Sequence, residues 1–227
     1  MSCWALLALK PPGQGKSRLA GVLTPPARER LIDSMLERVV DTLHAAREVA
    51  AVAVVTRERR VLPAELLALP DAGLGLNDAV AAGARTLAAL GARELLVLHP
   101  DLPLLAAGEV DAFVQRARAC GVGLAPDRRG SGTNAVYLAP PEGFEFGFGP
   151  ASFAHHLRQA QRRCAQPAIA RARGFAFDVD EPADLAALAA LADEPGARSV
   201  LEFDPRSSTP WTPGPKTCSP WPAAQRG

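Results

Sequence analysis

Hydrophobic positions along the chain fall into two kinds of segment, and the two kinds alternate. Short runs of consecutive apolar residues, such as residues 4–9, predict strands that are buried on both faces. Longer segments carry apolar residues at helical spacing. From Leu31 to Leu43 these recur at every fourth position, after a start signal made of Thr24 and two prolines. This alternation predicts an α/β fold in which helices cover both faces of a mostly parallel sheet.

The bounds of the predicted elements follow from these segments and from the turn residues between them. Strands are expected at residues 4–9, 52–56, 95–98, 122–125, 133–138 and 175–180. Helices are expected at residues 24–44, 77–90 (capped by Asn77), 107–119, 152–162 and 181–191. In open parallel sheets, ligands bind beyond the carboxyl ends of the strands. Lys10, Asp101 and Asp127 each follow a predicted strand there.

The length and composition predict one domain and a tail. A chain of 227 residues is long enough for a single α/β domain of about 200 residues. Beyond residue 197 the sequence becomes rich in proline and serine and carries no regular hydrophobic pattern. We therefore expect a domain over residues 1–197 and a flexible tail over residues 198–227.

The net charge and the cysteines limit which partners and which cell compartment are expected. The formal net charge is +1, which gives no electrostatic reason to expect nucleic acid or an anionic membrane as a partner. The four cysteines form no C-x-x-C pair, and no segment has the pattern of a signal peptide or a membrane span. A cytoplasmic protein is expected, and its apolar helix faces are compatible with a homodimer.

Two runs of small residues are candidates for holding anions. The first is 127–134 and follows an apolar strand, and the second is 148–152 and precedes a predicted helix. Free backbone N–H groups in such loops and at helix N-termini attract phosphate oxygens. Two runs of this kind in one small chain suggest that two phosphorylated ligands are brought together.

The loop after the first strand carries three cations, Lys10, Lys16 and Arg18. Gly15, Lys16 and Ser17 resemble the end of a phosphate-binding P-loop, but Lys10 stands where that motif requires its first glycine. A P-loop is therefore not expected. The three cations could neutralise a triphosphate, or they could be solvated loop charges, and both interpretations stay open.

Carboxylates that follow predicted strands suggest a Mg²⁺ site, since this ion binds one or two carboxylates together with substrate phosphates. Asp101 is one candidate, although an aspartate in such a turn is also a common structural residue. Asp178 and Asp180 alternate on a predicted strand, so only one is expected in the site and the other is expected to cap the following helix. Core or surface positions are expected for the histidines, which are His44, His99, His155 and His156.

No nucleophile with an adjacent base stands out in the sequence. A phosphate monoester would need none, because it is already ionised near neutral pH. Catalysis would then consist of positioning two anions and neutralising their charge.

Eight short motifs occur in the order of a known family. They include Lys16-Ser17-Arg18-Leu19, Asp101-Leu102-Pro103-Leu104-Leu105, Gly130-Ser131-Gly132-Thr133-Asn134-Ala135, Phe148-Gly149-Pro150-Ala151-Ser152-Phe153 and Asp178-Val179-Asp180. Over residues 5–190 the chain resembles the guanylyltransferases of deazaflavin coenzyme F(420) biosynthesis, which act on 2-phospho-L-lactate, phosphoenolpyruvate or 3-phosphoglycerate. The resemblance implies a Rossmann-like nucleotidyltransferase fold of the glycosyltransferase-A type.

By position, the resemblance also implies a role for particular residues. The metal ligands would be Asp101 and Asp178, with Mg²⁺ as the ion. The phosphorylated acid would be held by Thr133, Gly149 and Ser152. The GTP triphosphate would lie on Lys10, Lys16 and Arg18, and Asn77 is a candidate contact for the base.

The implied reaction is attack by the phosphate of the three-carbon acid on the α-phosphorus of GTP, with release of pyrophosphate. Pro100 stands before Asp101, where glycine is more usual in the family, and the choice among the three acids stays open. Two alternatives also stay open. One is a nucleotidyltransferase that uses CTP or a sugar phosphate, as molybdopterin cytidylyltransferase does, and the other is a nucleotide-binding protein without catalysis.

Overall fold

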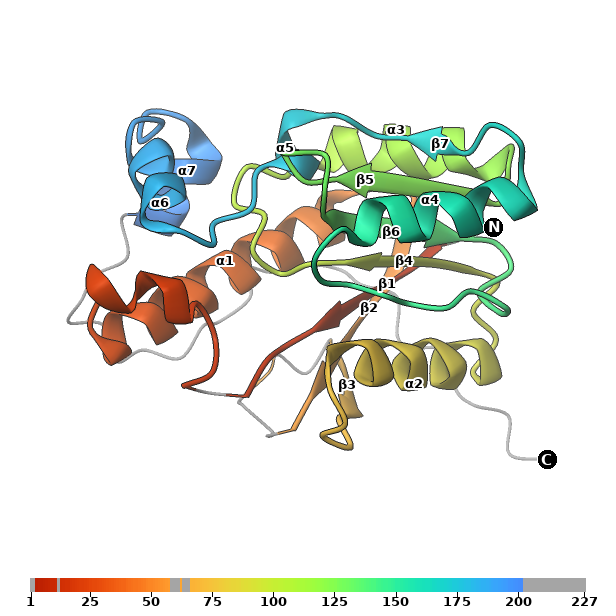
Figure 1. Cartoon of the computed structure of the whole chain (residues 1–227), viewed down its shortest axis with the longest axis horizontal. Coiled ribbons are helices and arrows are strands. Elements are labelled where there is room, and N and C mark those ends of the chain that lie inside the picture. Colours follow the sequence, from red (N-terminus) through yellow and green to blue (C-terminus); the bar gives the residue numbers. More distant parts are fainter. Residues whose placement is uncertain (1–2, 12, 58–61, 63–65, 202–227) are drawn as a thin grey trace.

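The computed structural model describes residues 3–11, 13–57, 62 and 66–201. Its centre is a seven-stranded sheet in the order β3-β2-β1-β4-β6-β5-β7 (Figure 1). The strands are β1 (Cys3–Ala8), β2 (Val49–Thr56), β3 (Leu67–Pro70), β4 (Glu94–Leu98), β5 (Val122–Pro126), β6 (Thr133–Leu138) and β7 (Ala168–Ile169). All pairings are parallel except those of β6, which runs antiparallel to both β4 and β5. The predicted α/β class and mostly parallel sheet are confirmed.

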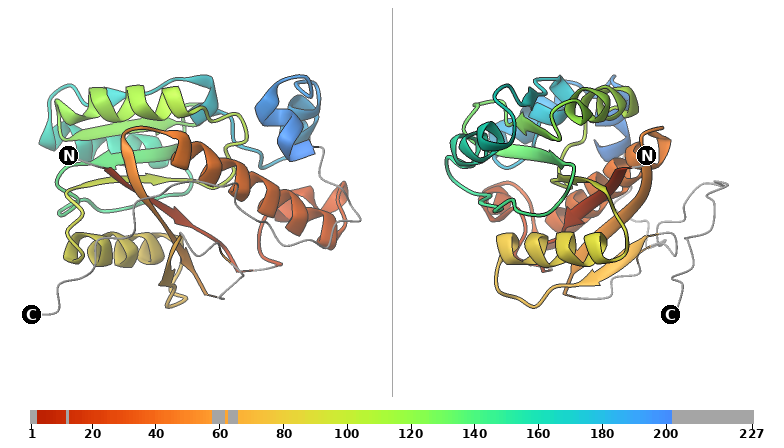
Figure 2. Two further views of the ribbon diagram at one scale, coloured as in Figure 1. Left: turned by 180° about the vertical axis from the view of Figure 1, so that it is seen from behind. Right: turned by 90° about the vertical axis from the view of Figure 1, so that its right-hand side faces the viewer.

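Helices cover both faces of this sheet (Figures 1 and 2). The long helices are α1 (Pro25–Ala45), α2 (Leu76–Ala89), α3 (Ala107–Arg118) and α4 (Ser152–Arg163). The short ones are η1 (Ser17–Gly21), α5 (Arg173–Ala176), α6 (Pro182–Ala189) and α7 (Pro195–Leu201). As predicted, Thr24 caps α1, where its hydroxyl accepts a hydrogen bond from the Ala27 N–H at 3.4 Å.

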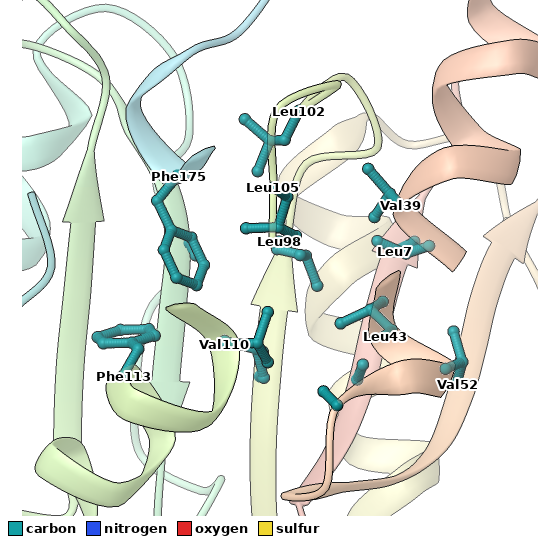
Figure 3. Packing of buried hydrophobic residues seen from close by; sticks show 14 of the residues in the cluster. Leu7, Val39, Leu43, Val52, Leu98, Leu102, Leu105, Val110, Phe113 and Phe175 are labelled. Carbon is teal, nitrogen blue, oxygen red and sulfur yellow. The ribbon is translucent and has the colours of Figure 1, made fainter. Parts of the chain in front are cut away.

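The alternation of side chains along the strands divides the core into two layers. On one face Leu7 of β1 packs with α1 and α3, and Phe113 of α3 meets the ring of Phe175 edge-on at 5.1 Å between centroids (Figure 3). On the other face Leu6 packs with α2 and α4. A third, smaller cluster joins the N-terminal half of α1 to α6 and α7, and it includes Met35 and Val200.

The strand predicted at residues 175–180 is wrong. Residues 173–176 form the short helix α5, and residues 177–180 are irregular. Phe175 and Phe177 alternate as in a strand, but each is buried in a different cluster, because the chain crosses here from the sheet to the α6–α7 pair. The strands β3 and β7 were not predicted.

The ends of the remaining elements agree closely with the prediction, with two differences. The expected cap of α2 is wrong, since Gly75 is the N-cap and Asn77 lies inside the first turn. Helix α7 continues past residue 197 to Leu201, so the predicted tail begins inside it, and residues 202–227 lie outside the described residues. Across the described part of the chain, none of the helices combines the length and the apolar character needed to cross a membrane.

Candidate active site

The candidate site lies at the edge of the sheet where the parallel strands end. β1 and β4 stop there and lead into Lys10 and Asp101. Because β6 is antiparallel, its first residue, Thr133, lies at the same edge. The N–H of His99 donates to the carbonyl of Asn134 at 3.0 Å and ties the ends of β4 and β6 together. The topology thus collects residues that are far apart in sequence.

Two adjoining cavities open at this edge. The smaller has a volume of about 150 Å³ and mostly apolar walls, to which Ile32, Met35 and Val80 contribute. The larger has a volume of about 560 Å³ and mostly polar walls. The side chains that line both are Lys10, Lys16, Leu76, His99, Phe148 and Asp180. The two cavities are therefore neighbouring compartments of one site.

Eight of the nine residues predicted for the site line these cavities. They are Lys10, Lys16, Arg18, Asp101, Thr133, Gly149, Ser152 and Asp178. The structure brings them together, and their individual roles remain predictions.

Lys16 lies in the wall between the two compartments. Its buried ammonium group forms ion pairs with the carboxylate of Asp101 and, at 2.8 Å, with Asp180. Burial acts to lower the pKa of Lys16, but Asp101 and Asp180 outweigh it and raise that pKa above its usual value. Burial acts to raise the pKa of Asp101, but the charge of Lys16 and its hydrogen bond outweigh it and hold that pKa below its usual range. The cluster is therefore charged at neutral pH.

The backbone of Lys16 is in the left-handed conformation, with φ at 52°. Outside glycine, only Ala151 shares such a φ among the described residues, and it directly precedes Ser152. Residues held in such conformations concentrate at functional sites. Lys16 lines the larger cavity with its own side chain, and Ala151 directly precedes Ser152, which also lines it.

Asp178 and Asp180 line the same cavity. The prediction that they face opposite sides is wrong, because the segment that carries them is not a strand. The prediction that one of the two caps the following helix is also wrong, since the capping contacts of α6 come from Glu181 and Asp184, and the Asp180 carboxylate binds Lys16. Asp184 instead accepts hydrogen bonds from the N–H groups of Asp180 and Glu181, at 2.9 and 2.8 Å. Burial, followed by the charge of Asp101, raises the pKa of Asp178 to about 6.

The donor set fits Mg²⁺ that arrives with a phosphate ligand. The Oδ1 atom of Asp101 is buried without a hydrogen-bond partner among the described residues, and the charge of Asp101 reaches Asp178. Over the same residues, no three acidic, histidine or cysteine side chains lie close enough to hold a metal ion by themselves. Mg²⁺ commonly binds one or two carboxylates and completes its shell with water and substrate phosphates. Asp101 and Asp178 are carboxylates of the kind this ion uses, one lining each cavity, and their joint role as its ligands remains a prediction.

In the first run of small residues, 127–134, backbone N–H groups donate to Asp127 of the same loop. The N–H of Ser131 donates to Oδ1 of Asp127 at 2.8 Å, and the N–H of Gly130 donates to the Asp127 carbonyl at 3.0 Å. The expectation that these amides are free for an anion is therefore wrong. A Cβ atom at Gly132 would lie 2.9 Å from Oδ2 of Asp127, so a larger residue here would displace the carboxylate that closes the loop. The loop is a rigid support for Thr133.

The second run turns sharply into α4. Gly149 has φ at 136°, a conformation that a residue with a Cβ atom rarely adopts. At the start of α4, the N–H of Ser152 donates to the Gly149 carbonyl at 3.2 Å, and that of Phe153 donates to the Ser131 carbonyl at 3.0 Å. Two of the expected anion donors are thus already used. What remains toward the cavity includes the hydroxyl groups of Ser152 and Thr133, both on buried residues.

Asn77 lines neither cavity. Its Oδ1 atom accepts from the Phe148 N–H at 2.7 Å, and its Nδ2 atom donates to the Phe148 carbonyl at 3.1 Å. This paired contact fixes the loop that carries Gly149. In the structure, Asn77 therefore holds the 148–149 loop in position.

Four charged residues that line the larger cavity were not among the residues predicted for the site, and they are Arg128, Arg129, Glu181 and Asp184. They form ion pairs with one another and with Arg18, which was predicted. Arg129 and Arg18 both pair with Glu181, at 2.8 and 3.4 Å, and Arg128 pairs with Asp184. Arg128 also lies over the ring of Phe177, 4.3 Å from its centroid. The pairs join the loop after β5, and Arg18 of η1, to the start of α6, and all of these residues line the larger cavity.

His99 was expected in the core or on the surface, but it lines both cavities. Its ring packs against Phe148 at 5.1 Å between centroids. Burial lowers the pKa of His99 below its usual value, so the ring is neutral at physiological pH. Pro100 follows His99 and lines the smaller cavity, so this segment shapes both compartments.

Comparison with known proteins identifies the family. Residues 3–202 match the family described as Guanylyl transferase CofC like. The chain belongs to this family. It is 40% identical over 193 residues to a phosphoenolpyruvate guanylyltransferase of Sphaerobacter thermophilus, with 83% of this chain and 93% of the relative covered. It is 32% identical over 193 residues to a 2-phospho-L-lactate guanylyltransferase of Methanopyrus kandleri, with 84% and 94% covered.

The solved structures agree on the fold. A 4-diphosphocytidyl-2C-methyl-D-erythritol synthase from Anaerococcus prevotii superposes with a TM-score of 0.58 at 10% identity, covering 85% of this chain and 96% of the other. The resemblance to the guanylyltransferases of coenzyme F(420) biosynthesis is confirmed, and so is the nucleotidyltransferase fold. This member of the CofC-like family is a nucleotidyltransferase.

Proposed function

We propose that the protein transfers a guanylyl group from GTP to a small phosphorylated three-carbon acid and releases pyrophosphate. The observation that carries this proposal is the pair of cavities that share Lys10, Lys16 and Asp180. A nucleotidyl transfer requires two anionic substrates to meet at one charged wall. Relatives named for phosphoenolpyruvate and for 2-phospho-L-lactate support a phosphorylated acid as the acceptor.

The character of the two cavities supports an assignment of the substrates. The smaller, apolar cavity suits a nucleoside, since Leu9, Val80 and Met35 offer packing surface. The larger, polar cavity suits the acid and the phosphates, because it presents Thr133 and Ser152 together with cationic side chains. Its volume of about 560 Å³ leaves room for both groups.

In the proposed step, a phosphate oxygen of the acid attacks the α-phosphorus of GTP. A new P–O bond forms, the bond between the α-phosphorus and its bridging oxygen to the β-phosphorus breaks, and pyrophosphate leaves with the electron pair. No proton has to be removed, because the attacking phosphate is already ionised. Lys16 and Lys10 would hold the negative charge that develops in this step, and the rigid loops would hold the acid in line.

Asp101 and Asp178 would hold a Mg²⁺ ion beside these phosphates. Such an ion supplies charge neutralisation and orientation of the phosphate oxygens. Lys16 binds Asp101 and Asp180 in this structure. It would keep the carboxylates of Asp101 and Asp180 oriented toward the site.

The proposal is tested by a substrate screen. Each of 2-phospho-L-lactate, phosphoenolpyruvate and 3-phosphoglycerate is incubated with Mg²⁺ and either GTP or CTP, with pyrophosphate release and product mass as readouts. We expect a guanylylated acid from at least one combination with GTP. A clear preference for CTP would assign the protein to the cytidylyltransferases, and no turnover with any combination would favour a binding protein.

A further inference from the structure

His156 is a fully buried histidine on α4, directly behind the wall of the larger cavity. It lines neither cavity itself, but both of its ring nitrogens are engaged. One contact reaches the loop before Gly149, and the other reaches Thr133. Both of these residues are expected to hold the phosphorylated acid.

The hydrogen bonds determine which ring nitrogen carries the proton. The N–H of Gly147 donates to Nε2 of His156 at 2.9 Å. A backbone N–H can only donate, so Nε2 must be the unprotonated nitrogen. In the neutral ring the proton is then on Nδ1. Nδ1 lies 2.9 Å from the hydroxyl oxygen of Thr133 and donates to it.

This arrangement decides what Thr133 can do. A hydroxyl group has one proton to donate and oxygen lone pairs that accept. Because the Thr133 oxygen already accepts from His156, its own proton is free to point elsewhere. Thr133 lines the larger cavity, where an anion offers an acceptor.

We infer that His156 is a positioning residue that makes the Thr133 hydroxyl a dedicated hydrogen-bond donor to the acid substrate. The inference rests on the proposed function, because it takes the ligand of the larger cavity to be a phosphorylated acid. His156 acts through Thr133 and does not touch the substrate.

The surroundings keep the ring neutral and in one orientation. Phe148 meets it edge-on at 5.0 Å between centroids, and Phe144 packs at 5.5 Å. Burial lowers the pKa of His156 to about 4. A protonated ring would lose the bond from Gly147, so neutrality preserves both contacts.

The first experiment separates the two ring nitrogens by substitution. In His156→Gln the side-chain carbonyl can still accept from Gly147, but no donor remains at the Nδ1 position. In His156→Asn an amide N–H can take the place of Nδ1–H. We expect His156→Gln to raise KM for the acid by about tenfold, the size of one hydrogen bond to a charged group, with KM for GTP unchanged. His156→Asn should recover most of that loss.

A double-mutant cycle with Thr133→Val shows whether the effect passes through Thr133. We expect His156→Gln to have no further effect on KM for the acid once the hydroxyl is gone. His155→Gln is the matched control, since it makes the same change one residue earlier on α4, and should leave both KM values unchanged. An equal effect of His156→Gln with and without the Thr133→Val substitution would overturn the inference, as would a parallel rise of both KM values.

A spectroscopic measurement on the unaltered protein tests the inference even if the variants do not fold or no substrate reacts. Long-range proton–nitrogen NMR correlations of the histidine rings report the tautomer, and the loss of one signal set in His156→Asn or His156→Gln assigns it. We expect His156 with the proton on Nδ1. A proton on Nε2 overturns the inference whatever the enzyme does. If the tautomer is as expected but no acid reacts with GTP, the proposed function fails, and phosphoenolpyruvate binding by calorimetry replaces KM in the cycle.

Discussion

Lys16 and Asp101 are 85 residues apart in sequence and form a buried ion pair. Removing one partner of such a pair leaves the other charge in a poorly solvated place. Lys16 has Asp180 as a second partner, which softens this loss. A conservative substitution of Asp101 should therefore test its function without unfolding the protein.

Asp101→Asn is expected to lower kcat/KM by at least about 100-fold, because the amide cannot supply the charge that the proposed metal and Lys16 require. Circular dichroism should show an intact fold. Asp193→Asn, on a fully exposed side chain in the turn before α7, is the control and should leave kcat/KM unchanged. An Asp101→Asn enzyme that retains near-normal turnover would remove Asp101 from the mechanism.

His156 links the site to acid stability. Its pKa is about 4 in the folded protein and 6.5 at its ordinary value, so the unfolded chain binds a proton first as the pH falls. Its contribution to the free energy of unfolding is fully present above pH 6.5 and is lost between pH 6.5 and about 4. The linked loss is on the order of 3 kcal/mol.

Urea unfolding at several pH values in this window should therefore show a steeper loss of stability for the unaltered protein than for His156→Gln. His155→Gln should retain the steep loss. Parallel curves for the unaltered protein and His156→Gln would show that His156 is not buried in its neutral form.

At the scale of elements, the sequence predicted the strands that are buried on both faces, whose apolar residues pack into the two layers of the core. The strand at 133–138 was predicted with its observed ends, and so was the start of α4. The pattern at 175–180 misled because its alternating apolar residues are buried in two different clusters. The short strands β3 and β7 are defined by pairing with β2 and β5, which no local pattern encodes.

The same distinction applies to the site. Lys16, Asp101 and Thr133 follow strand ends or fit family motifs, so sequence alone could place them near one another. The role of Asp184 could not be predicted, because it depends on the path of the irregular segment before α6. The tautomer of His156 depends on a contact with Gly147 that only the folded loop creates.

Asp184 ties the start of α6 to the site, since one carboxylate caps the helix and pairs with Arg128. Asp184→Ala should lower the free energy of unfolding by about 1–2 kcal/mol through loss of the cap. It should also lower activity, because the N–H of Asp180 loses its acceptor and Asp180 is then less firmly placed beside Lys16. Urea unfolding and a turnover assay measure the two effects. With Asp193→Ala as the control, an unchanged stability would contradict the capping role.

At the scale of the whole molecule, α7 closes the third hydrophobic cluster against α1, and Val200 is buried within it. A chain that ends at residue 202, the last position of the family match, should keep both stability and activity. A chain that ends at residue 197 should lose about 2–3 kcal/mol of stability, because it lacks Val200 and Leu201. Urea unfolding of the two truncated chains provides the comparison. Equal stability would show that α7 does not belong to the folded domain.

The two-compartment site requires that the acid keeps all of its phosphate oxygens while GTP loses pyrophosphate. Phosphoenolpyruvate, or whichever acid reacts in the screen, can be labelled with a heavy oxygen isotope at its phosphate and incubated with GTP and Mg²⁺. Mass analysis of both products then follows the label. Attack by the acid on the α-phosphorus predicts a guanylylated acid that carries the whole label and a pyrophosphate that carries none. Label in the released pyrophosphate, or a nucleotide product that does not contain the acid, would contradict guanylyl transfer at this site.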